Sequence, residues 1–138
     1  MEISRRADYG VRVIIDLAAL PKDGRVSTSE IADRQNIPGP FLAKIISQLS
    51  LSGLVSTYRG SGGGVSLTRP ASEISLLQVI EALDGPLQLN RCAIEPEACP
   101  RTGHCPAHQI WARAQKDLTK LLGGTTFGDL VETGWKTG

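Results

Sequence analysis

Apolar and polar positions alternate through the first twenty residues with the period of a helix. Apolar side chains recur at three- and four-residue steps, which predicts a helix from about Arg5 to Leu20 with Ser4 as its N-cap. Pro21 and the turn at residues 22–25 end it. We expect one face of this helix to lie against a core, and that face is formed by Ala7, Val11, Ile14, Leu17 and Ala18.

Two shorter helices are predicted next. Ser27 and Glu30 have the spacing of a capping box, in which each side chain accepts the other residue's backbone N–H, and a helix to about Gln35 follows, with Ile31 and Ala32 inward. After the break at Pro38-Gly39-Pro40, a third helix runs from about Pro40 to Gly53. Its inner face would carry Phe41, Leu42, Ile45, Ile46 and Leu49, and its outer face Ala43, Lys44, Ser47, Gln48 and Leu51. This pair is typical of a helix-turn-helix motif.

A glycine-rich hairpin follows the two helices. Residues 54–58 and 65–68 have strand character, and the sequence RGSGGG at 59–64 separates them. A phosphate-binding loop is excluded, because no Gly-Lys-Ser/Thr follows and no helix begins there. We interpret the hairpin as a wing whose glycines let the backbone approach DNA closely, with Arg59 as its charged contact.

The second half of the chain predicts two helices around an irregular segment. Ser75 would cap a helix at residues 76–84 that Gly85 ends, with Ile74 and Val79 spaced as a hydrophobic staple. Residues 86–106 have no sustained period, so we expect another agent, such as a metal centre, to organise them. A long helix at about 107–122 follows, and the final segment at 125–131 is expected to pack beside it. Its apolar stripe suggests a dimer seam: Ile110, Trp111, Ala114, Leu118, Leu121 and Leu122.

The predicted fold is therefore mainly α with a small β-hairpin wing. We assign residues 1–85 to a winged helix-turn-helix DNA-binding domain, 86–106 to a cysteine cluster-binding loop, and 107–138 to a dimerisation helix with a C-terminal segment. Residues 1–70 hold nine basic and six acidic side chains, an excess too small to identify a polyanion partner by itself. No apolar run approaches the ~20 residues of a membrane span, and the first six residues lack the apolar stretch of a secretion signal. We expect a cytoplasmic protein.

The three cysteines lie together, at Cys92, Cys99 and Cys105. An odd number argues against a disulfide framework, and thiolates select zinc or iron–sulfur clusters. The gaps of six and five residues are wide for a zinc knuckle, so an iron–sulfur cluster is favoured and a structural Cys3His zinc site is the alternative. His108 is the local candidate for a fourth ligand. No acid/base pair or nucleophile set is evident, so we expect neither an enzyme nor a small-molecule substrate.

The order of these motifs resembles the Rrf2 family of bacterial winged-helix regulators, the group that contains IscR, NsrR, RirA and CymR. The resemblance rests on SRRADYG at 4–10, GLV at 53–55 with RGSGGG at 59–64, LQVIEAL at 77–83, the three cysteines, and Trp111 followed by TFGDL at 126–130. It implies a homodimer that binds a palindromic operator in double-stranded DNA and regulates transcription through the state of an iron–sulfur cluster.

The resemblance also implies a ligand set. The family's ligand cysteines fall on Cys92, Cys99 and Cys105. The IscR-like branch takes its fourth ligand at the position of His108, whereas the NsrR-like branch uses an aspartate of the partner subunit at the position of Asp8. The gap of six residues between the first two cysteines departs from the commoner five, which leaves [2Fe–2S] and [4Fe–4S] both open. Ala43 stands where the IscR branch carries a glutamate, so that branch's operator preference is not expected here.

A mechanism follows from these expectations. The recognition helix would enter the major groove with Lys44, Ser47 and Gln48, and the wing would enter the minor groove with Arg59, Ser61, Gly62 and Gly63. Phosphates would be approached by Ser27, Thr28, Pro38, Gly39 and Pro40. The regulator would sense nitric oxide, redox state or iron and cluster supply; an iron–sulfur electron-transfer or carrier protein is a further alternative.

Overall fold

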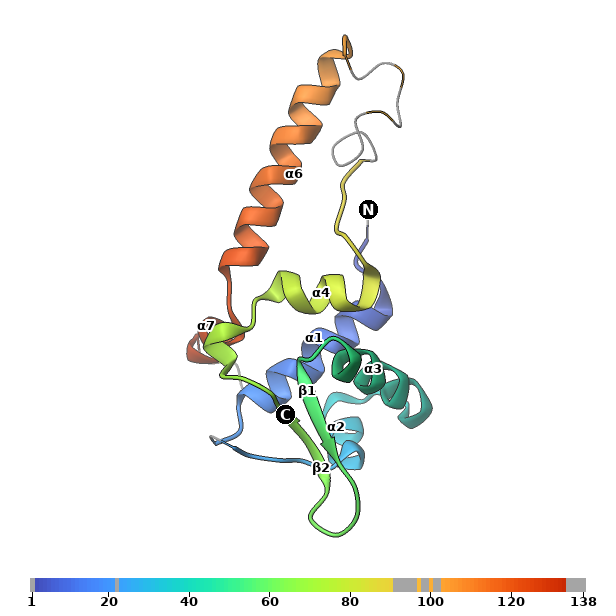
Figure 1. Ribbon diagram of the computed structural model, residues 1–138, viewed down its shortest axis with the longest axis vertical. Coiled ribbons are helices and arrows are strands. Elements are labelled where there is room, and N and C mark those ends of the chain that lie inside the picture. Colours follow the sequence, from blue (N-terminus) through green and yellow to red (C-terminus); the bar gives the residue numbers. More distant parts are fainter. Residues whose placement is uncertain (1, 22, 91–96, 98–99, 101–102, 134–138) are drawn as a thin grey trace.

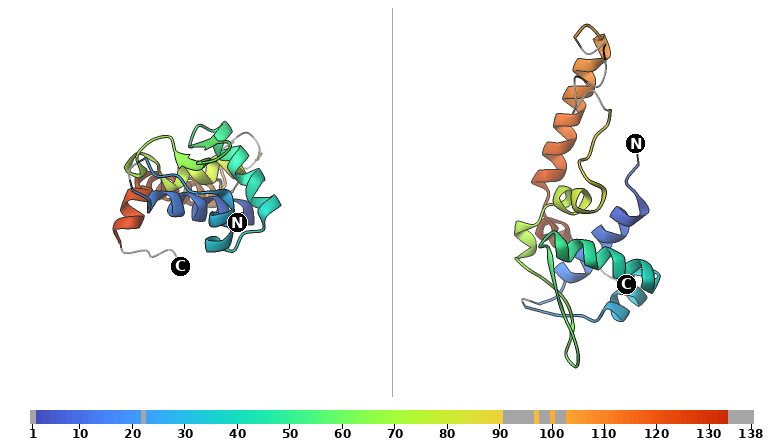
Figure 2. Two further views of the ribbon diagram at one scale, coloured as in Figure 1. Left: turned by 90° about the horizontal axis from the view of Figure 1, so that it is seen from below. Right: turned by 45° about the vertical axis from the view of Figure 1, so that its right-hand side comes forward.

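The computed structural model describes residues 2–21, 23–90, 97, 100 and 103–133 of the 138. In that part the chain forms a compact lower half of short helices with one hairpin, and a single long helix that projects from it (Figures 1 and 2). The elements in order are α1 Arg5–Ala18, α2 Thr28–Gln35, α3 Gly39–Leu51, β1 Val55–Tyr58, β2 Gly64–Leu67, η1 Ala71–Glu73, α4 Leu76–Asp84, α6 Pro106–Gly124 and α7 Phe127–Glu132. The expected class, mainly α with a small hairpin, is confirmed.

Helix α1 lies at the centre and contacts α2, α3, α4, α7 and β2. The Ser4 hydroxyl caps it by accepting the N–H of Ala7 at 3.0 Å, as the sequence predicts. The helix ends at Ala18, two residues earlier than predicted. The N–H of Leu20 bonds to the carbonyl of Leu17, which tightens the last turn, and the following Pro21 cannot continue the ladder.

One charged residue of α1 is fully buried. Asp16 is 2% exposed and accepts two hydrogen bonds from the Arg34 guanidinium, at 3.1 and 2.7 Å, and one from the Gln35 amide at 3.0 Å. The hydrogen bond to Asp16 raises the pKa of Arg34 above its usual value, against the opposing effect of desolvation. This cluster fixes α2 against α1, and no local pattern in the sequence predicted it.

The helix-turn-helix forms with two corrections. The Ser27 hydroxyl accepts the N–H of Glu30 at 3.2 Å, but Glu30 turns to Arg34, 3.6 Å away, so only half of the predicted capping box exists. Phe41, predicted inward, is 36% exposed because it packs on the edge of the Tyr9 ring, with centroids 5.5 Å apart. The other four predicted inner residues of α3 are buried.

The wing is a two-stranded antiparallel hairpin in which Val55 pairs with Leu67 and Tyr58 with Gly64. A third segment joins it, because Val26 and Val65 exchange both backbone hydrogen bonds, at 3.1 and 2.8 Å. This bridge was not predicted. It ties the hairpin to the residue that immediately precedes the α2 cap.

Helix α4 has the predicted bounds, with Ser75 as its cap, Gly85 in a positive-φ conformation at its end, and Ile74 and Val79 buried. The short α7 does not pack beside the long helix as predicted. It packs on α1 and η1, where Phe127 is fully buried and its N–H bonds to the carbonyl of Ile74 at 3.0 Å. The chain after α6 therefore returns to the central core.

Helix α6 contacts α4 at its lower end and otherwise extends away from the core (Figure 1). Gln115 is its one buried residue. Its amide accepts the N–H of Leu89 at 2.8 Å and donates to the carbonyl of Leu87 at 2.6 Å. The Glu81 carboxylate also accepts the N–H of Leu87, at 3.2 Å. The start of the irregular segment is thus held against α6 and α4 before the cysteines begin.

Replacing Arg34 by Gln should lower the free energy of unfolding by about 2–3 kcal/mol, because the Asp16 carboxylate would stay buried without its cation. The loss is smaller than for a fully buried pair, since the Arg34 side chain is 37% exposed. Arg12→Gln is the matched control: it breaks an exposed ion pair with Asp8 and should cost less than about 1 kcal/mol. Urea unfolding measures both, and equal losses would contradict this account.

Candidate nucleic-acid interface and cysteine segment

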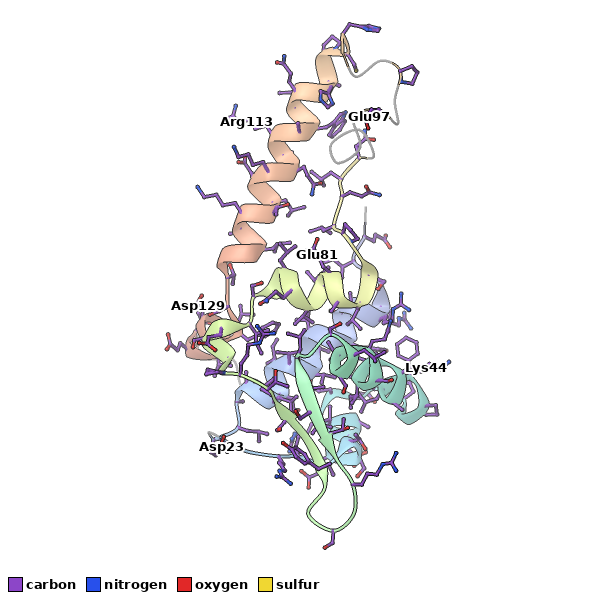
Figure 3. All side chains as sticks on the ribbon, in the orientation of Figure 1. Asp23, Lys44, Glu81, Glu97, Arg113 and Asp129 are labelled. Atoms are coloured by element: carbon purple, nitrogen blue, oxygen red, sulfur yellow. The ribbon has the colours of Figure 1, made fainter. Side chains whose placement is uncertain are left out.

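The outer face of α3 carries the predicted reading residues. Lys44 and Ser47 are exposed, and Gln48 is half-buried. Figure 3 shows Lys44 directed away from the body of the molecule. These three side chains line one groove of about 720 Å³ together with Ala43, Phe41 and residues of the α1 start, Ser4 and Arg6. Arg6 therefore lies beside α3. No contact was predicted for it, although the basic pair at 5–6 was a signal.

The start of α1 is tied to the end of α4. Asp84 accepts hydrogen bonds from the Ser4 backbone, at 3.2 Å, and from the Ser4 hydroxyl, and it lies 3.9 Å from Arg6. Asp84 is the last residue of α4 before the irregular segment. One carboxylate therefore connects the base of the cysteine segment with the groove along α3.

The predicted phosphate contacts lie at two helix starts. Ser27 caps α2, and Thr28 is exposed in its first turn. Together with wing residues they line a small hollow of about 280 Å³. Pro38, Gly39 and Pro40 are exposed where α3 begins. Backbone N–H groups in a first helical turn have no partner within the helix and are suited to anions. At the start of α3 only Gly39 and Phe41 can offer one, because Pro38 and Pro40 have no N–H.

The wing tip needs its glycines. Gly60 and Gly62 have φ of +81° and +76°, a region that side-chain-bearing residues rarely adopt. A Cβ at Gly63 would lie 2.5 Å from the carbonyl oxygen of Tyr58. Arg59 and Ser61 are exposed beside them. The tip is thus a tight turn with an open backbone and one cationic side chain.

One residue near the wing was missed. The guanidinium carbon of Arg25 lies 3.6 Å from the centre of the Tyr58 ring, and its Nη1 donates to the carbonyl of Gly62 at 3.4 Å. The sequence predicts only a turn at residues 22–25. It holds no signal for this contact, because the Val26–Val65 bridge beside Arg25 is visible only in the structure.

The candidate metal ligands are placed in part. Cys105 is the N-cap residue of α6, and its carbonyl accepts the N–H of His108 at 3.1 Å, so the two side chains are one helical turn apart. His108 Nδ1 is buried and has no hydrogen-bond partner among the described residues. Cys92 and Cys99 lie outside the described residues. Within the described ranges, no three Cys, His, Asp or Glu side chains come together as a metal site, so Asp8 does not join Cys105 and His108 in one chain.

Asp8 sits in a different setting. Its carboxylate forms an ion pair with Arg12 at 2.9 Å, and the Arg12 guanidinium lies 5.3 Å from the centre of the Tyr9 ring. Tyr9 in turn packs on Phe41 of the recognition helix. The groove around Asp8, of about 720 Å³, is also lined by Ile80 of α4 and Leu122 of α6.

The predicted seam on α6 is only partly covered: Ala114, Leu118 and Leu122 are half-buried, and the other three residues are exposed. Ile110, Trp111 and Leu121 are 61%, 41% and 65% exposed. Three large apolar side chains left uncovered on a projecting helix are typical of an interface. None of the helices within the described ranges could span a membrane.

Known proteins resemble this chain along nearly its full length. The Rrf2 family, described as iron-dependent transcriptional regulators, matches residues 3–133. The transcriptional regulator IscR of Xenorhabdus nematophila is 33% identical over 132 residues, which cover 96% of this chain and 80% of that protein. The structure of CymR, the global cysteine regulator of B. subtilis, has a TM-score of 0.81 at 27% identity and covers 98% of this chain and 99% of its own. The structure of T. potens IscR gives 0.77 at 27% identity, with 100% and 94% covered.

Proposed function

The chain belongs to the Rrf2 family of DNA-binding transcriptional regulators, and from that premise we propose that it is a homodimer whose affinity for a palindromic operator is controlled by a labile iron–sulfur cluster. The observation that carries the DNA-binding part is the arrangement of α2, α3 and the wing. All three lie in the half of the molecule opposite α6 (Figures 1 and 2). Lys44 and Ser47 on the outer face of α3 are exposed.

We assign base reading to the outer face of α3 in the major groove. The amide of Gln48 can pair with an adenine edge, and Lys44 and Ser47 can donate to base or phosphate oxygens. The N-terminal turns of α2 and α3 would position the protein on the phosphates through Ser27, Thr28 and the Pro38–Pro40 turn. Arg59, with Ser61, Gly62 and Gly63, would follow the minor groove.

The homodimer is supported by the uncovered apolar residues of α6. A two-fold pairing along that helix would bury Ile110, Trp111 and Leu121 and would present two recognition helices to one face of DNA. A palindromic operator with half-sites about one helical turn apart matches such symmetry. In this proposal residues 1–85 bind DNA, residues 86–106 hold the cluster and residues 107–138 pair the subunits.

The donor set fits a metal centre. Cys105 is the N-cap residue of α6, and the buried Nδ1 of His108, which has no hydrogen-bond partner among the described residues, is one turn away. We propose Cys92, Cys99, Cys105 and His108 as ligands. Asp8 is the weaker candidate for the fourth position, because its carboxylate is already paired with Arg12. When bound, an iron–sulfur cluster would supply a redox-active centre that nitric oxide, oxidants or iron shortage can alter. This chemistry suits the reducing cytoplasm.

The family alone does not fix the signal, since CymR of B. subtilis is named for cysteine and not for iron. The iron-dependent description of the family and the four donors in this chain favour iron. A structural zinc site would use the same four donors, and metal analysis separates the two possibilities.

Measurements of operator affinity should distinguish the role of the wing from that of the recognition helix. Arg59→Ala is expected to weaken binding to most sequences alike and to lower the salt slope by about one. Gln48→Ala should cost about 1–3 kcal/mol at the operator and relax its preference for one base. Titrations by fluorescence anisotropy over several salt concentrations measure both effects.

Controls for these two variants come from α6. Lys120→Ala and Gln109→Ala remove an exposed lysine and an exposed glutamine from the opposite half of the molecule, and both should bind like the unmodified protein. If Gln48→Ala kept its full base preference, α3 would not be the reading helix.

The fourth ligand can be tested by substitution. His108→Ala should lose most of its iron and sulfide on anaerobic purification, whereas Asp8→Asn should retain them, because the Asp8 carboxylate is engaged by Arg12. The exposed His104 provides the matched control, and His104→Ala should be unchanged. Iron and sulfide per chain, with the visible spectrum, are the readout. Retention in His108→Ala together with loss in Asp8→Asn would reverse the assignment.

A further inference from the structure

The wing of this chain is anchored at two consecutive residues of the segment before α2, Arg25 and Val26. Arg25 stacks on the Tyr58 ring and donates to Gly62, Val26 exchanges two backbone hydrogen bonds with Val65, and Ser27 caps α2. Tyr58 is the last residue of β1, and Gly62 lies in the tip. The single side chain of Arg25 therefore touches both the end of a strand and the turn beyond it.

The contacts of Arg25 with Tyr58 and Gly62, called here the brace, can stabilise a hairpin that is weak by itself. A two-stranded hairpin of four-residue strands is marginal by itself, and glycines in the tip add conformational freedom that binding would have to remove. The Tyr58 ring is 39% exposed, and its hydroxyl is 3.5 Å from the Ser66 hydroxyl of the facing strand. A guanidinium on the outer face of that ring can hold the tip in one orientation.

The surroundings of Arg25 favour a brace over an ion pair. Its partners in the described structure are an aromatic ring and a backbone carbonyl, and none of the ion pairs found there includes Arg25. The planar guanidinium can stack on a ring and donate in its own plane at once, which an ammonium group cannot do. The hydrogen bond is long, so the stacking contributes most of the contact.

We propose that Arg25 is a positioning residue for DNA recognition. Through its contacts with Tyr58 and Gly62 it holds the wing in its binding conformation before DNA is bound. Arg59 and the tip can then enter the minor groove without a further loss of conformational freedom. This inference rests on the proposed DNA-binding function. It implies that the part of the operator read by the wing, where A·T and G·C differ in groove width, is read less well when the brace is lost.

Four variants test the brace. The probe is an operator selected from random-sequence DNA with the unmodified protein, plus a second duplex with A·T replaced by G·C at the wing positions. Arg25→Lys keeps the charge but not the planar stack, and Tyr58→Val removes the ring. Each should bind the operator about 3- to 5-fold more weakly, the size of an exposed cation–π contact. Each should also lose most of the preference between the two duplexes and keep an unchanged salt slope.

The remaining two variants are internal checks. The double variant R25K/Y58V should bind no more weakly than either single variant, because both changes remove one interaction. Tyr58→Phe keeps the ring and should behave like the unmodified protein. Thermal melting of every variant should stay within a few degrees of the original, since the contact is at the surface.

Other outcomes would overturn the inference. A fifth variant, Arg25→Ala, tests for a direct phosphate contact. If Tyr58→Val binds normally while Arg25→Ala weakens binding and lowers the salt slope by about one, Arg25 contacts a phosphate directly. If the variants melt early and bind both duplexes equally poorly, the contact only stabilises the fold. Failure of the unmodified protein to select any operator would instead refute the proposed function itself.

Discussion

The packing around α1 is the constraint on which the other elements depend. Half of its fourteen residues are buried. It contacts both helices of the helix-turn-helix, α2 and α3, the wing strand β2, and the helices α4 and α7. At Gly10 the helix runs so close to α4 that a Cβ would collide with Leu83. On another side the buried Asp16 holds Arg34 and Gln35 of α2. Because cores of this density do not deform continuously, a displacement of α1 would move several elements together.

This arrangement gives the proposed regulation a physical route. The start of α1 is bound to Asp84, which lies two residues before the cysteine segment at 86–106. It also lines the groove beside the outer face of α3. One turn later, Asp8 and Arg12 connect through Tyr9 to Phe41 at the start of α3. On the helix that follows the segment, Gln115 of α6 binds the backbone of residues 87 and 89 and so holds the start of the segment against α6. A change at the cysteine segment would therefore bear on α3, the predicted recognition helix, and on the helix proposed to pair the subunits. In the proposal these two elements set the half-site geometry.

The periodicity and capping signals of the sequence predicted α3, α4 and the hairpin well, because each depends on neighbours within a few residues. Two local details also failed, the capping box at Glu30 and the end of α1, but the other failures depend on residues far apart in the sequence. Asp16 lies in an apolar stretch and finds its partners at positions 34 and 35, and Val26 finds its own at 65. Phe41 was placed in the core by its period, but an aromatic neighbour on α1 holds it at the surface. Most of the candidate DNA residues are exposed, whereas Ser27, Gln48 and Gly63 are half-buried. Cys105 and His108 lie one helical turn apart. The contacts of all of them with DNA or metal stay predictions.

Anaerobically purified protein, assayed for iron, sulfide, zinc and operator affinity before and after exposure to nitric oxide, tests the central claim most directly. The account predicts iron with sulfide, a broad visible absorbance that nitric oxide bleaches, and an operator affinity that changes at least about 10-fold with it, the range of an ordinary allosteric coupling. Stoichiometric zinc without sulfide, or an affinity that is the same with and without the cluster, would contradict it and leave a winged-helix regulator whose signal does not act through these cysteines.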